Sequence, residues 1–435
     1  MYEKSLLWDI TYDCNLRCQH CYNAEKIQKY KKEEKSLLQY IDWIDKLSDE
    51  MGFDHIHFLG GEPLIKDDFY QIVKYASQKG MHTTINTNLT LFDDENDIID
   101  FLHTGIEQIT VSLDSPIKEI NDAIRGKGVF DKVISNLKKI LYWISRDKLD
   151  VKVQIATVVT EVNYASLDQF PELLSTLGVR YLSLLSLYQC GSAKINKEKL
   201  FCTYDKELHT YLKLIKKNTE LANPITVFLD CKPLLIDFIN KYMHFCVNKE
   251  CLLNLPSSGC EAGQRIWFMD PSGEIYPCGP CSQTPSLSDS GVNIMDADAQ
   301  LVSMKNKFLS LSEKQETICA LCMFKDLCGK ECPISNQSLF CEYIFPKYKN
   351  LMHFIISSNY KINDSIILQD TPQEIQVYDC NKNVFIQLGI EEQKVLREIK
   401  YEKKISSFLN SGDDLLKISD AIDALKTAGI IDRIN

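Results

Sequence analysis

Three cysteines near the start of the chain have the spacing of metal ligands. Cys14, Cys18 and Cys21 lie four and three residues apart within the stretch Thr-Tyr-Asp-Cys-Asn-Leu-Arg-Cys-Gln-His-Cys-Tyr, and no fourth cysteine is nearby. An iron–sulfur cube held by four cysteines transfers electrons, whereas a cube held by three keeps one iron free to bind a substrate or cofactor. The alternative is three unrelated buried thiols, so the surrounding residues must decide.

The residues around the triplet predict a position at the end of a buried strand. Residues 5–11 form a short apolar run typical of such a strand, and ligands of α/β folds bind where parallel strands end. A helical stretch (36–51) and a second strand (55–59) lead into Gly-Gly-Glu-Pro at 60–63. The two glycines let backbone approach a ligand closely, and the Glu62 carboxylate can accept hydrogen bonds from an ammonium group.

Together these residues resemble the radical S-adenosylmethionine (SAM) superfamily. The resemblance implies that Cys14, Cys18 and Cys21 hold a [4Fe–4S] cluster whose open iron chelates the amino and carboxylate groups of SAM. Each short motif alone also suits an ordinary turn, but five such segments follow in the expected order at predicted strand ends. The residues that the resemblance implies in SAM binding are Gly60, Gly61, Glu62 and Pro63 at the methionyl amine, His20 and Tyr22 beside the adenine, Asn86 at the end of the third strand, Ser112 and Asp114 for ribose and carboxylate, and Arg125 at the SAM carboxylate.

Strand-like and helix-like segments alternate as far as about residue 187. Repeated βα units predict an α/β fold with a parallel sheet and outer helices. Six such units resemble the partial (βα)6 barrel of the superfamily, so we assign residues 1–187 to this barrel. Residues 188–245, with a helix at 205–221 and a strand at 225–229, are interpreted as a bridge.

A second set of cysteines follows at 246–345, and its spacing resembles, cysteine for cysteine, the seven-cysteine SPASM extension of some radical SAM enzymes. Zinc is the alternative, because short-spaced cysteine pairs also suit tetrahedral zinc. The resemblance implies two auxiliary [4Fe–4S] clusters, three clusters in all. The implied ligands are Cys260, Cys278 and Cys332 for the first auxiliary cluster, with Cys251, Cys246, Cys281 or no residue as the fourth, and Cys319, Cys322, Cys328 and Cys341 for the second.

The last part of the chain has a different character. Residues 346–362 are predicted as a helical linker, and 363–435 as a small α+β, winged-helix-like domain. A hairpin at 374–388 followed by helices at about 391–399, 405–409 and 415–428 resembles PqqD-like domains. Such domains capture precursor peptides by adding the peptide as an extra strand. The alternative is a cap that only closes the fold.

Composition restricts the class of protein. The 435 residues are 45% hydrophobic, enough to fill more than one core, so we expect a soluble multidomain enzyme. With no signal peptide and no apolar run of ~18–20 residues, we expect a cytoplasmic protein that does not enter a membrane. The 17 cysteines then favour metal ligation over disulfides. A net charge of −11 indicates no nucleic-acid partner.

The resemblance to peptide maturases implies a radical SAM oxidoreductase that cleaves SAM to a 5′-deoxyadenosyl radical. The radical would abstract hydrogen from a ribosomally made precursor peptide, to form a crosslink or another modification. Flavodoxin or ferredoxin is the expected electron donor, and no catalytic acid or base is assigned. One alternative is an anaerobic sulfatase-maturating type of enzyme, but those relatives carry aspartate where this chain has Gly279. Another is an iron–sulfur redox sensor or peptide-binding scaffold, against which the intact 60–63 segment and Arg125 argue.

Overall fold

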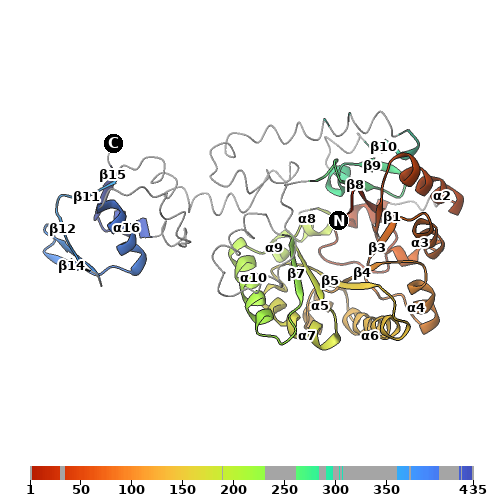
Figure 1. Cartoon of the computed structure of the whole chain (residues 1–435), viewed down its shortest axis with the longest axis horizontal. Coiled ribbons are helices and arrows are strands. Elements are labelled where there is room, and N and C mark those ends of the chain that lie inside the picture. Colours follow the sequence, from red (N-terminus) through yellow and green to blue (C-terminus); the bar gives the residue numbers. More distant parts are fainter. Residues whose placement is uncertain are drawn as a thin grey trace. The chain divides into compact units, whose positions relative to one another are not determined.

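The computed structural model describes most of the barrel region and parts of the remainder. The chain divides into two compact units, one of residues Met1–Asp237 with Phe245–Asn336 and one of Phe238–His244 with Gln337–Asn435 (Figure 1). The residues described are 2–29, 35–188, 190–230, 261–283, 291–296, 303, 306, 360–371, 374–400, 421–422 and 424–433.

The first unit is built on one ten-stranded sheet with the order β10-β9-β8-β1-β2-β3-β4-β5-β6-β7. Neighbours from β1 to β7 are parallel, and β8 is parallel to β1, whereas β9 and β10 are antiparallel. The strands are β1 Ser5–Thr11, β2 His55–Gly60, β3 His82–Thr87, β4 Gln108–Ser112, β5 Lys152–Val158, β6 Tyr181–Leu185, β7 Thr226–Asp230, β8 Ile266–Met269, β9 Glu274–Tyr276 and β10 Val292–Asn293.

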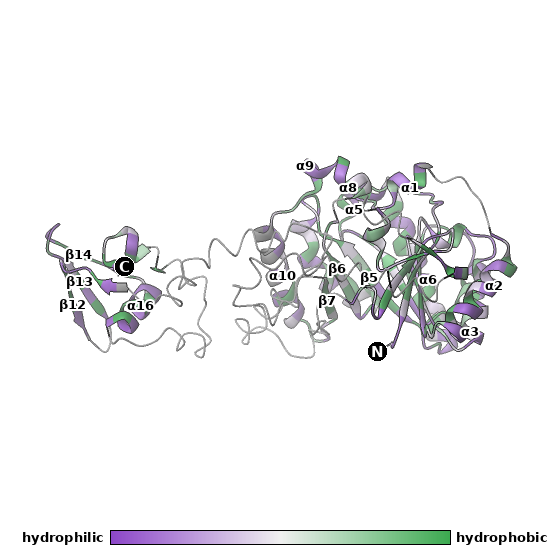
Figure 2. Cartoon of the chain, turned by 90° about the horizontal axis from the view of Figure 1, so that it is seen from above, coloured by the Kyte–Doolittle hydropathy of each residue, from purple (hydrophilic) through white to green (hydrophobic). Residues whose placement is uncertain are grey.

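Helices connect the parallel strands, and α2, α3, α4, α6, α7 and α10 follow the outside of the sheet (Figure 1). Figure 2 shows hydrophilic and hydrophobic residues along α2, α3 and α6, as expected of helices with one apolar face. The α-helices of this unit are α1 Ala24–Lys29, α2 Leu37–Asp45, α3 Phe69–Gln78, α4 Glu95–Leu102, α5 Lys118–Arg125, α6 Val129–Asp147, α7 Phe170–Leu177, α8 Gly191–Ile195, α9 Lys197–Leu200 and α10 Tyr204–Thr219. A short π-helix, η1 Lys46–Glu50, and the short 3-10 helices η2 Pro63–Ile65, η3 Tyr164–Gln169, η5 Gly279–Gln283 and η7 Ile294–Asp296 accompany them.

Strand β1 shows how the sequence separates core from site. Trp8 is fully buried, and its ring centroid lies 5.7 Å from that of Tyr40 and 6.1 Å from that of Trp43, both on the outer helix α2. Successive strand residues point to opposite faces, so the neighbouring Asp9 faces the other side of the sheet. There it contacts Tyr22, which follows the cysteine triplet. The apolar core therefore lies between the outer face of the sheet and the helices, and the inner face of the sheet carries polar side chains.

The sheet extends beyond the boundary that we predicted at residue 187. β7 lies in the predicted bridge, yet it pairs with β6 from Tyr181↔Thr226 to Leu185↔Asp230. β8 lies in the predicted cysteine-rich module and pairs with β1. The six predicted βα repeats are present, and further strands lengthen the sheet on both sides. Pairing between such distant segments depends on backbone hydrogen bonds, which a hydrophobic pattern does not reveal.

The described part of the second unit contains two small sheets and one long helix. β12 (Ile366–Asp370), β13 (Ile375–Asp379) and β14 (Val384–Ile386) form an antiparallel meander in that order, followed by α16 (Ile390–Lys400). The predicted hairpin is the β13–β14 pair, with Val377 opposite Ile386. β12 is a strand that the sequence analysis did not predict.

The prediction of a helical linker at 346–362 is wrong at its end. Tyr360–Ile362 is strand β11, which pairs antiparallel with β15 (Ile431–Arg433). Its partner lies about seventy residues further along the chain, so no local pattern indicates the strand. Residues 346–359 and the helix predicted at 405–409 lie outside the described residues. No helix among the residues that the structure describes is long and apolar enough to span a membrane.

Candidate functional site

The cysteine loop is attached to the Gly-Gly-Glu-Pro loop through backbone. Gly61 N donates to Thr11 O at 2.7 Å, and Glu62 N donates to Asp13 O at 2.8 Å. A Cβ atom at Gly61 would lie 2.1 Å from Asp13 O, and one at Gly60 would lie 2.2 Å from Thr11 O. Because side chains do not fit at either position, the two glycines allow the loops after β1 and β2 to lie against each other.

A cavity of about 290 Å³ opens at the carboxyl ends of the parallel strands. Residues 185–188, at and after the end of β6, form part of its wall. Pro63 begins the turn η2 beside the cavity, and Asp114 lies behind it; neither is among the lining residues. The predicted cluster and SAM residues that line the cavity are Cys14, Cys18, His20, Cys21, Tyr22, Gly60, Gly61, Glu62, Asn86, Ser112 and Arg125.

The three cysteines are free thiols that face this cavity together. Burial raises the pKa of Cys14 to about 11. Burial and the neighbouring Cys18 thiol raise that of Cys21 to about 12. Thiolates are therefore unfavourable here without added positive charge, and bound metal ions supply such charge and deprotonate a thiol outright. Three thiols that line one cavity and need added positive charge fit a three-cysteine iron–sulfur cluster.

Glu62 places a carboxylate in the cavity wall with only 1% of its surface exposed. Its Oε2 accepts a hydrogen bond from Asn88 N at 2.7 Å, and its Oε1 accepts from Thr87 Oγ1 at 2.7 Å. Burial raises the pKa of Glu62 to about 7, although these hydrogen bonds oppose the rise. A ligand ammonium group would favour the ionised form, so the geometry fits the amine of an amino acid.

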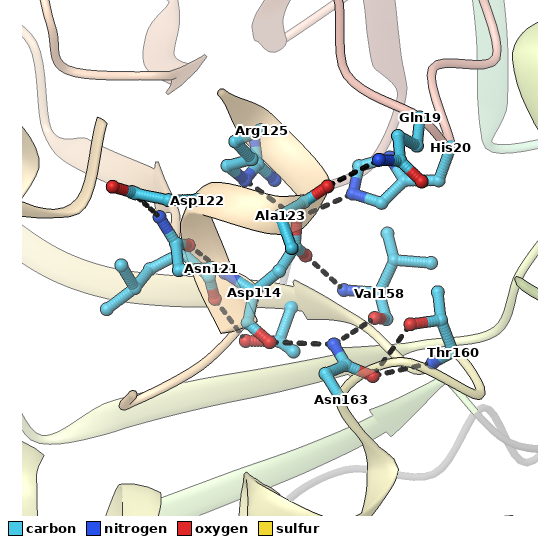
Figure 3. Close-up of polar contacts among 12 residues, drawn as sticks. Gln19, His20, Asp114, Asn121, Asp122, Ala123, Arg125, Val158, Thr160 and Asn163 are labelled. Carbon is cyan, nitrogen blue, oxygen red and sulfur yellow. Dashed lines mark hydrogen bonds and ion pairs between the residues drawn. The ribbon is translucent and has the colours of Figure 1, made fainter. Parts of the chain in front are cut away.

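Asp114 is the centre of a buried polar network behind the cavity (Figure 3). Its Oδ2 lies 2.5 Å from His20 Nε2 and 2.7 Å from Arg125 Nε, and its Oδ1 accepts from Val158 N at 3.0 Å. The Nε–H of Arg125 is poorly aligned with Asp114, so this contact is an ion pair and not a good hydrogen bond. Burial alone would raise the pKa of Asp114, but the charges of Arg125 and His20 hold it well below the usual range.

Two asparagines hold the backbone of Asp114. Asn121 Oδ1 accepts from Asp114 N at 3.0 Å, and Asn163 Nδ2 donates to Asp114 O at 2.7 Å (Figure 3). The side chain of Asp114 therefore faces His20 and Arg125, both of which line the cavity. The family resemblance implied that Asp114 contacts the ribose or carboxylate of SAM, whereas in the structure its carboxylate orients His20 and Arg125.

His57 and Asp9 also support the site, although no sequence motif indicated them. His57 Nε2 lies 3.1 Å from Asn86 Oδ1, and burial lowers the pKa of His57 to about 4, so its ring is neutral at physiological pH. Asp9 is fully buried and accepts hydrogen bonds from Tyr22 OH at 3.1 Å and from Asn23 Nδ2 at 3.0 Å. A charged or imidazole side chain inside an otherwise apolar strand was the available signal.

Of the second cysteine set, the structure describes Cys278 and the neighbouring Cys281. Their Sγ atoms are 3.4 Å apart, and both pack with Phe268 and Tyr276. Two adjacent thiols, of which Cys281 is buried and Cys278 partly buried, fit a shared metal group. The other predicted ligands and candidates lie outside the described residues: Cys246, Cys251, Cys260, Cys319, Cys322, Cys328, Cys332 and Cys341.

Comparisons with known proteins agree with this geometry. Residues 8–177 match the model of the Radical SAM superfamily. The chain is 27% identical over 329 residues to the mycofactocin maturase MftC of Mycobacterium tuberculosis, covering 75% of this chain and 77% of that one. It is 24% identical over 337 residues to an AdoMet-dependent heme synthase of Oleidesulfovibrio alaskensis, covering 74% and 81%.

A solved structure shares the fold. Streptococcus suis SuiB bound to S-adenosylmethionine aligns with a TM-score of 0.59 at 16% identity, covering 75% of this chain and 72% of that one. At this identity the likeness concerns the fold alone. The prediction of a radical SAM enzyme with a parallel α/β sheet is confirmed.

Proposed function

Because this chain is an enzyme of the radical SAM superfamily, with residues 8–177 as its radical SAM domain, we propose that it modifies a ribosomally made precursor peptide. The observation that carries the reaction type is the cavity lined by Cys14, Cys18 and Cys21 together with Glu62 and Arg125. When bound there, an iron–sulfur cluster and SAM supply a 5′-deoxyadenosyl radical, which abstracts hydrogen from the substrate.

In this proposal the residues of the chain bind, orient and exclude water. The three cysteines hold the cluster, and the buried Glu62 carboxylate receives the SAM ammonium group. Arg125, oriented by Asp114, pairs with the SAM carboxylate. On the same proposal Gly60, Gly61, Pro63, Asn86 and Ser112 contact the methionyl and ribose parts, and His20 and Tyr22 lie beside the adenine.

Two observations support a peptide substrate. The relative MftC is named a maturase, and SuiB has also been solved with its precursor peptide SuiA. The second unit offers a free strand edge, because among the described residues β14 pairs with β13 on one side alone. Backbone hydrogen bonds to such an edge bind an extended peptide with little demand on its sequence. We assign peptide recognition to the PqqD-like segment at 363–435, together with the preceding strand β11 at Tyr360–Ile362.

The auxiliary clusters also belong to the proposal. Cys260, Cys278 and Cys332 would hold the first, with Cys251, Cys246, Cys281 or no residue as the fourth ligand. Cys319, Cys322, Cys328 and Cys341 would hold the second. Flavodoxin or ferredoxin would deliver the electron that begins each turnover.

The test is anaerobic turnover with peptides of candidate precursors. The reconstituted protein should cleave SAM to 5′-deoxyadenosine, and mass spectrometry should find a peptide that has lost hydrogen. The control carries Ala at Cys14, Cys18 and Cys21 and should do neither. Two outcomes would contradict the proposed substrate class. In one, the protein cleaves SAM and modifies a porphyrin precursor but no peptide; in the other, it modifies a sulfatase peptide but no candidate precursor peptide. Absence of SAM cleavage in the unaltered protein would contradict the reaction type and favour a sensor or scaffold.

A further inference from the structure

Lys26 connects two parts of the chain that carry the two cysteine sets. It lies on α1, five residues after Cys21. Its Nζ donates a hydrogen bond to Ser282 Oγ at 2.7 Å, across 256 residues of sequence. Ser282 belongs to η5, the turn that also contains Cys281, and its hydroxyl donates to Gly279 O at 2.7 Å. One ammonium group therefore lies between the first cysteine loop and the Cys278–Cys281 turn.

The side chain of Lys26 is held from several directions. Its Nζ also donates to Tyr12 OH at 3.0 Å and lies 5.2 Å from the centroid of the Phe268 ring. Burial lowers the pKa of Lys26, and the charges of Asp9 and Asp270 oppose that change. The two oxygen acceptors, Tyr12 OH and Ser282 Oγ, and the face of the Phe268 ring are groups that stabilise an ammonium ion at this position.

The two thiols share this environment. Phe268, which the ammonium faces, packs against Cys278 and the almost fully buried Cys281. The Sγ atoms of Cys278 and Cys281 lie 3.4 Å apart, so a metal group bound to them would lie beside Phe268 and the Lys26 ammonium group. In an apolar region a charge acts over a longer distance than in water, because the effective dielectric constant is low.

We propose that Lys26 is a positioning residue and the counter-charge for the metal group bound at the Cys278–Cys281 turn. The inference rests on the auxiliary cluster of the proposed function and deepens it. The potential of an iron–sulfur cluster depends on local charge and on hydrogen bonds around its sulfurs. Reduction adds one electron, so a fixed positive charge stabilises the reduced state and raises the potential. Removing the Lys26 charge therefore lowers the potential of this cluster.

The experiment uses the full-length chain with Ala at Cys14, Cys18 and Cys21, reconstituted anaerobically, so that the remaining iron belongs to the second cysteine set. Lys26→Met removes the charge at similar length, and Lys26→Arg retains it. The matched control is Lys46→Met, because Lys46 Nζ donates to Met295 O at 2.9 Å and so also reaches the second cysteine region. Iron is counted, and each midpoint potential is measured by a reductive titration followed by electron paramagnetic resonance.

We expect one cluster to become harder to reduce in Lys26→Met, to recover in Lys26→Arg and to be unaffected in Lys46→Met. Loss of iron in Lys26→Met with retention in Lys26→Arg also supports the counter-charge. If Lys26→Met keeps the iron content and the midpoint potentials of the parent protein, the role of Lys26 is overturned and the proposed auxiliary clusters are not. Equal iron loss in Lys26→Met and Lys26→Arg has the same meaning. A parent protein without auxiliary iron overturns the proposed clusters and this inference with them.

Discussion

At the scale of single residues, the site separates groups that face the cavity from groups that orient them. Arg125 and His20 line the cavity, whereas Asp114 lies behind them with no exposed surface. His57 holds Asn86 in the same way from β2. The segments that the sequence motifs indicated contribute residues to one cavity, but a motif does not tell which of two polar residues faces it.

Arg125→Ala should weaken SAM binding by about 1.5–3 kcal/mol, the range for a hydrogen bond to a charged group. Equilibrium binding of SAM to the reconstituted protein measures the change, with iron content as the check that the cluster remains. Asp114→Asn should weaken SAM binding too, and the losses in the double variant should be less than additive, because Asp114 acts in part through Arg125. Additive losses would mean that the two residues act independently. Arg146→Ala, on the exposed surface of α6, is the control.

The buried Glu62 predicts a pH dependence of SAM binding. Its pKa is raised to about 7, so below that pH the incoming ammonium group must displace a proton. Affinity should fall by about tenfold per pH unit below neutrality and be constant above it. Without SAM, the raised pKa has the opposite consequence for the fold: stability is lost as pH rises from about 4.3, the pKa of an unfolded glutamate, through the folded value.

Titrations of the protein with SAM at pH values from about 6 to about 8, roughly one unit on each side of neutrality, test this prediction. Glu62→Gln should bind SAM weakly with a flat profile. An equally steep profile in Glu62→Gln would assign the titration to another group.

At the scale of elements, the site depends on how closely the loop after β1 approaches the loop after β2. Gly61 N and Glu62 N both donate to carbonyls of the cysteine loop. These two hydrogen bonds fix the position of the cysteine loop relative to the Glu62 carboxylate. Because both are made by backbone atoms, a change of side-chain rotamer does not alter them. The β1–β2 register, with Trp8 opposite Phe58, carries this alignment from the core to the cavity.

Gly61→Ala should damage both folding and SAM binding. The added Cβ would lie 2.1 Å from Asp13 O, so the cysteine loop must move. Overpacking of this kind typically costs about 1–3 kcal/mol of unfolding free energy. Gly80→Ala is the control: Gly80 has a φ of +81° but no heavy atom within 4 Å of the added Cβ, so it should lose stability without changing SAM affinity. Normal SAM binding by Gly61→Ala would show that the two loops can separate freely.

At the scale of the whole molecule, the chain combines a parallel-sheet unit with a smaller unit of meander and helix. The first holds the cavity, and its sheet takes in β8 from the second cysteine region. The second exposes the apolar side chains of Ile367 and Phe385, at 59% and 75% of their surface. This division predicts that cofactor chemistry and peptide capture can be impaired separately.

Anaerobically reconstituted protein should contain about twelve irons, four for each of three clusters. Replacing Cys14, Cys18 and Cys21 together by Ala should remove about four of them. It should also abolish SAM cleavage, since no cluster remains in the cavity. Iron and metal analysis measures both proteins. About four irons in the unaltered protein, with zinc bound in addition, would identify the second cysteine set as a zinc site.

A chain ending at residue 359 should still cleave SAM without substrate, because the cavity residues all precede residue 189. The cut removes β11 together with its partner β15, so neither strand is left unpaired. Binding of a full-length precursor should fall by tenfold or more, about 1.4 kcal/mol. Fluorescence anisotropy of a labelled precursor measures the affinity. Equal binding by the shortened and full-length chains would make the segment a structural cap.

The sequence by itself determined the superfamily, the order of the βα repeats and the segments that gather at the cavity, because cysteine spacing and short motifs at strand ends are local patterns. Only the tertiary structure decided which polar residues line the cavity, which residues orient them, and which strands form the two ends of the sheet. Asp114 turns toward His20 and Arg125, and β7 and β8 join the sheet from outside the predicted barrel. Lys26 reaches Ser282 across the two cysteine sets. Each of these contacts joins segments distant in sequence, and their free energy depends on packing that no local pattern encodes.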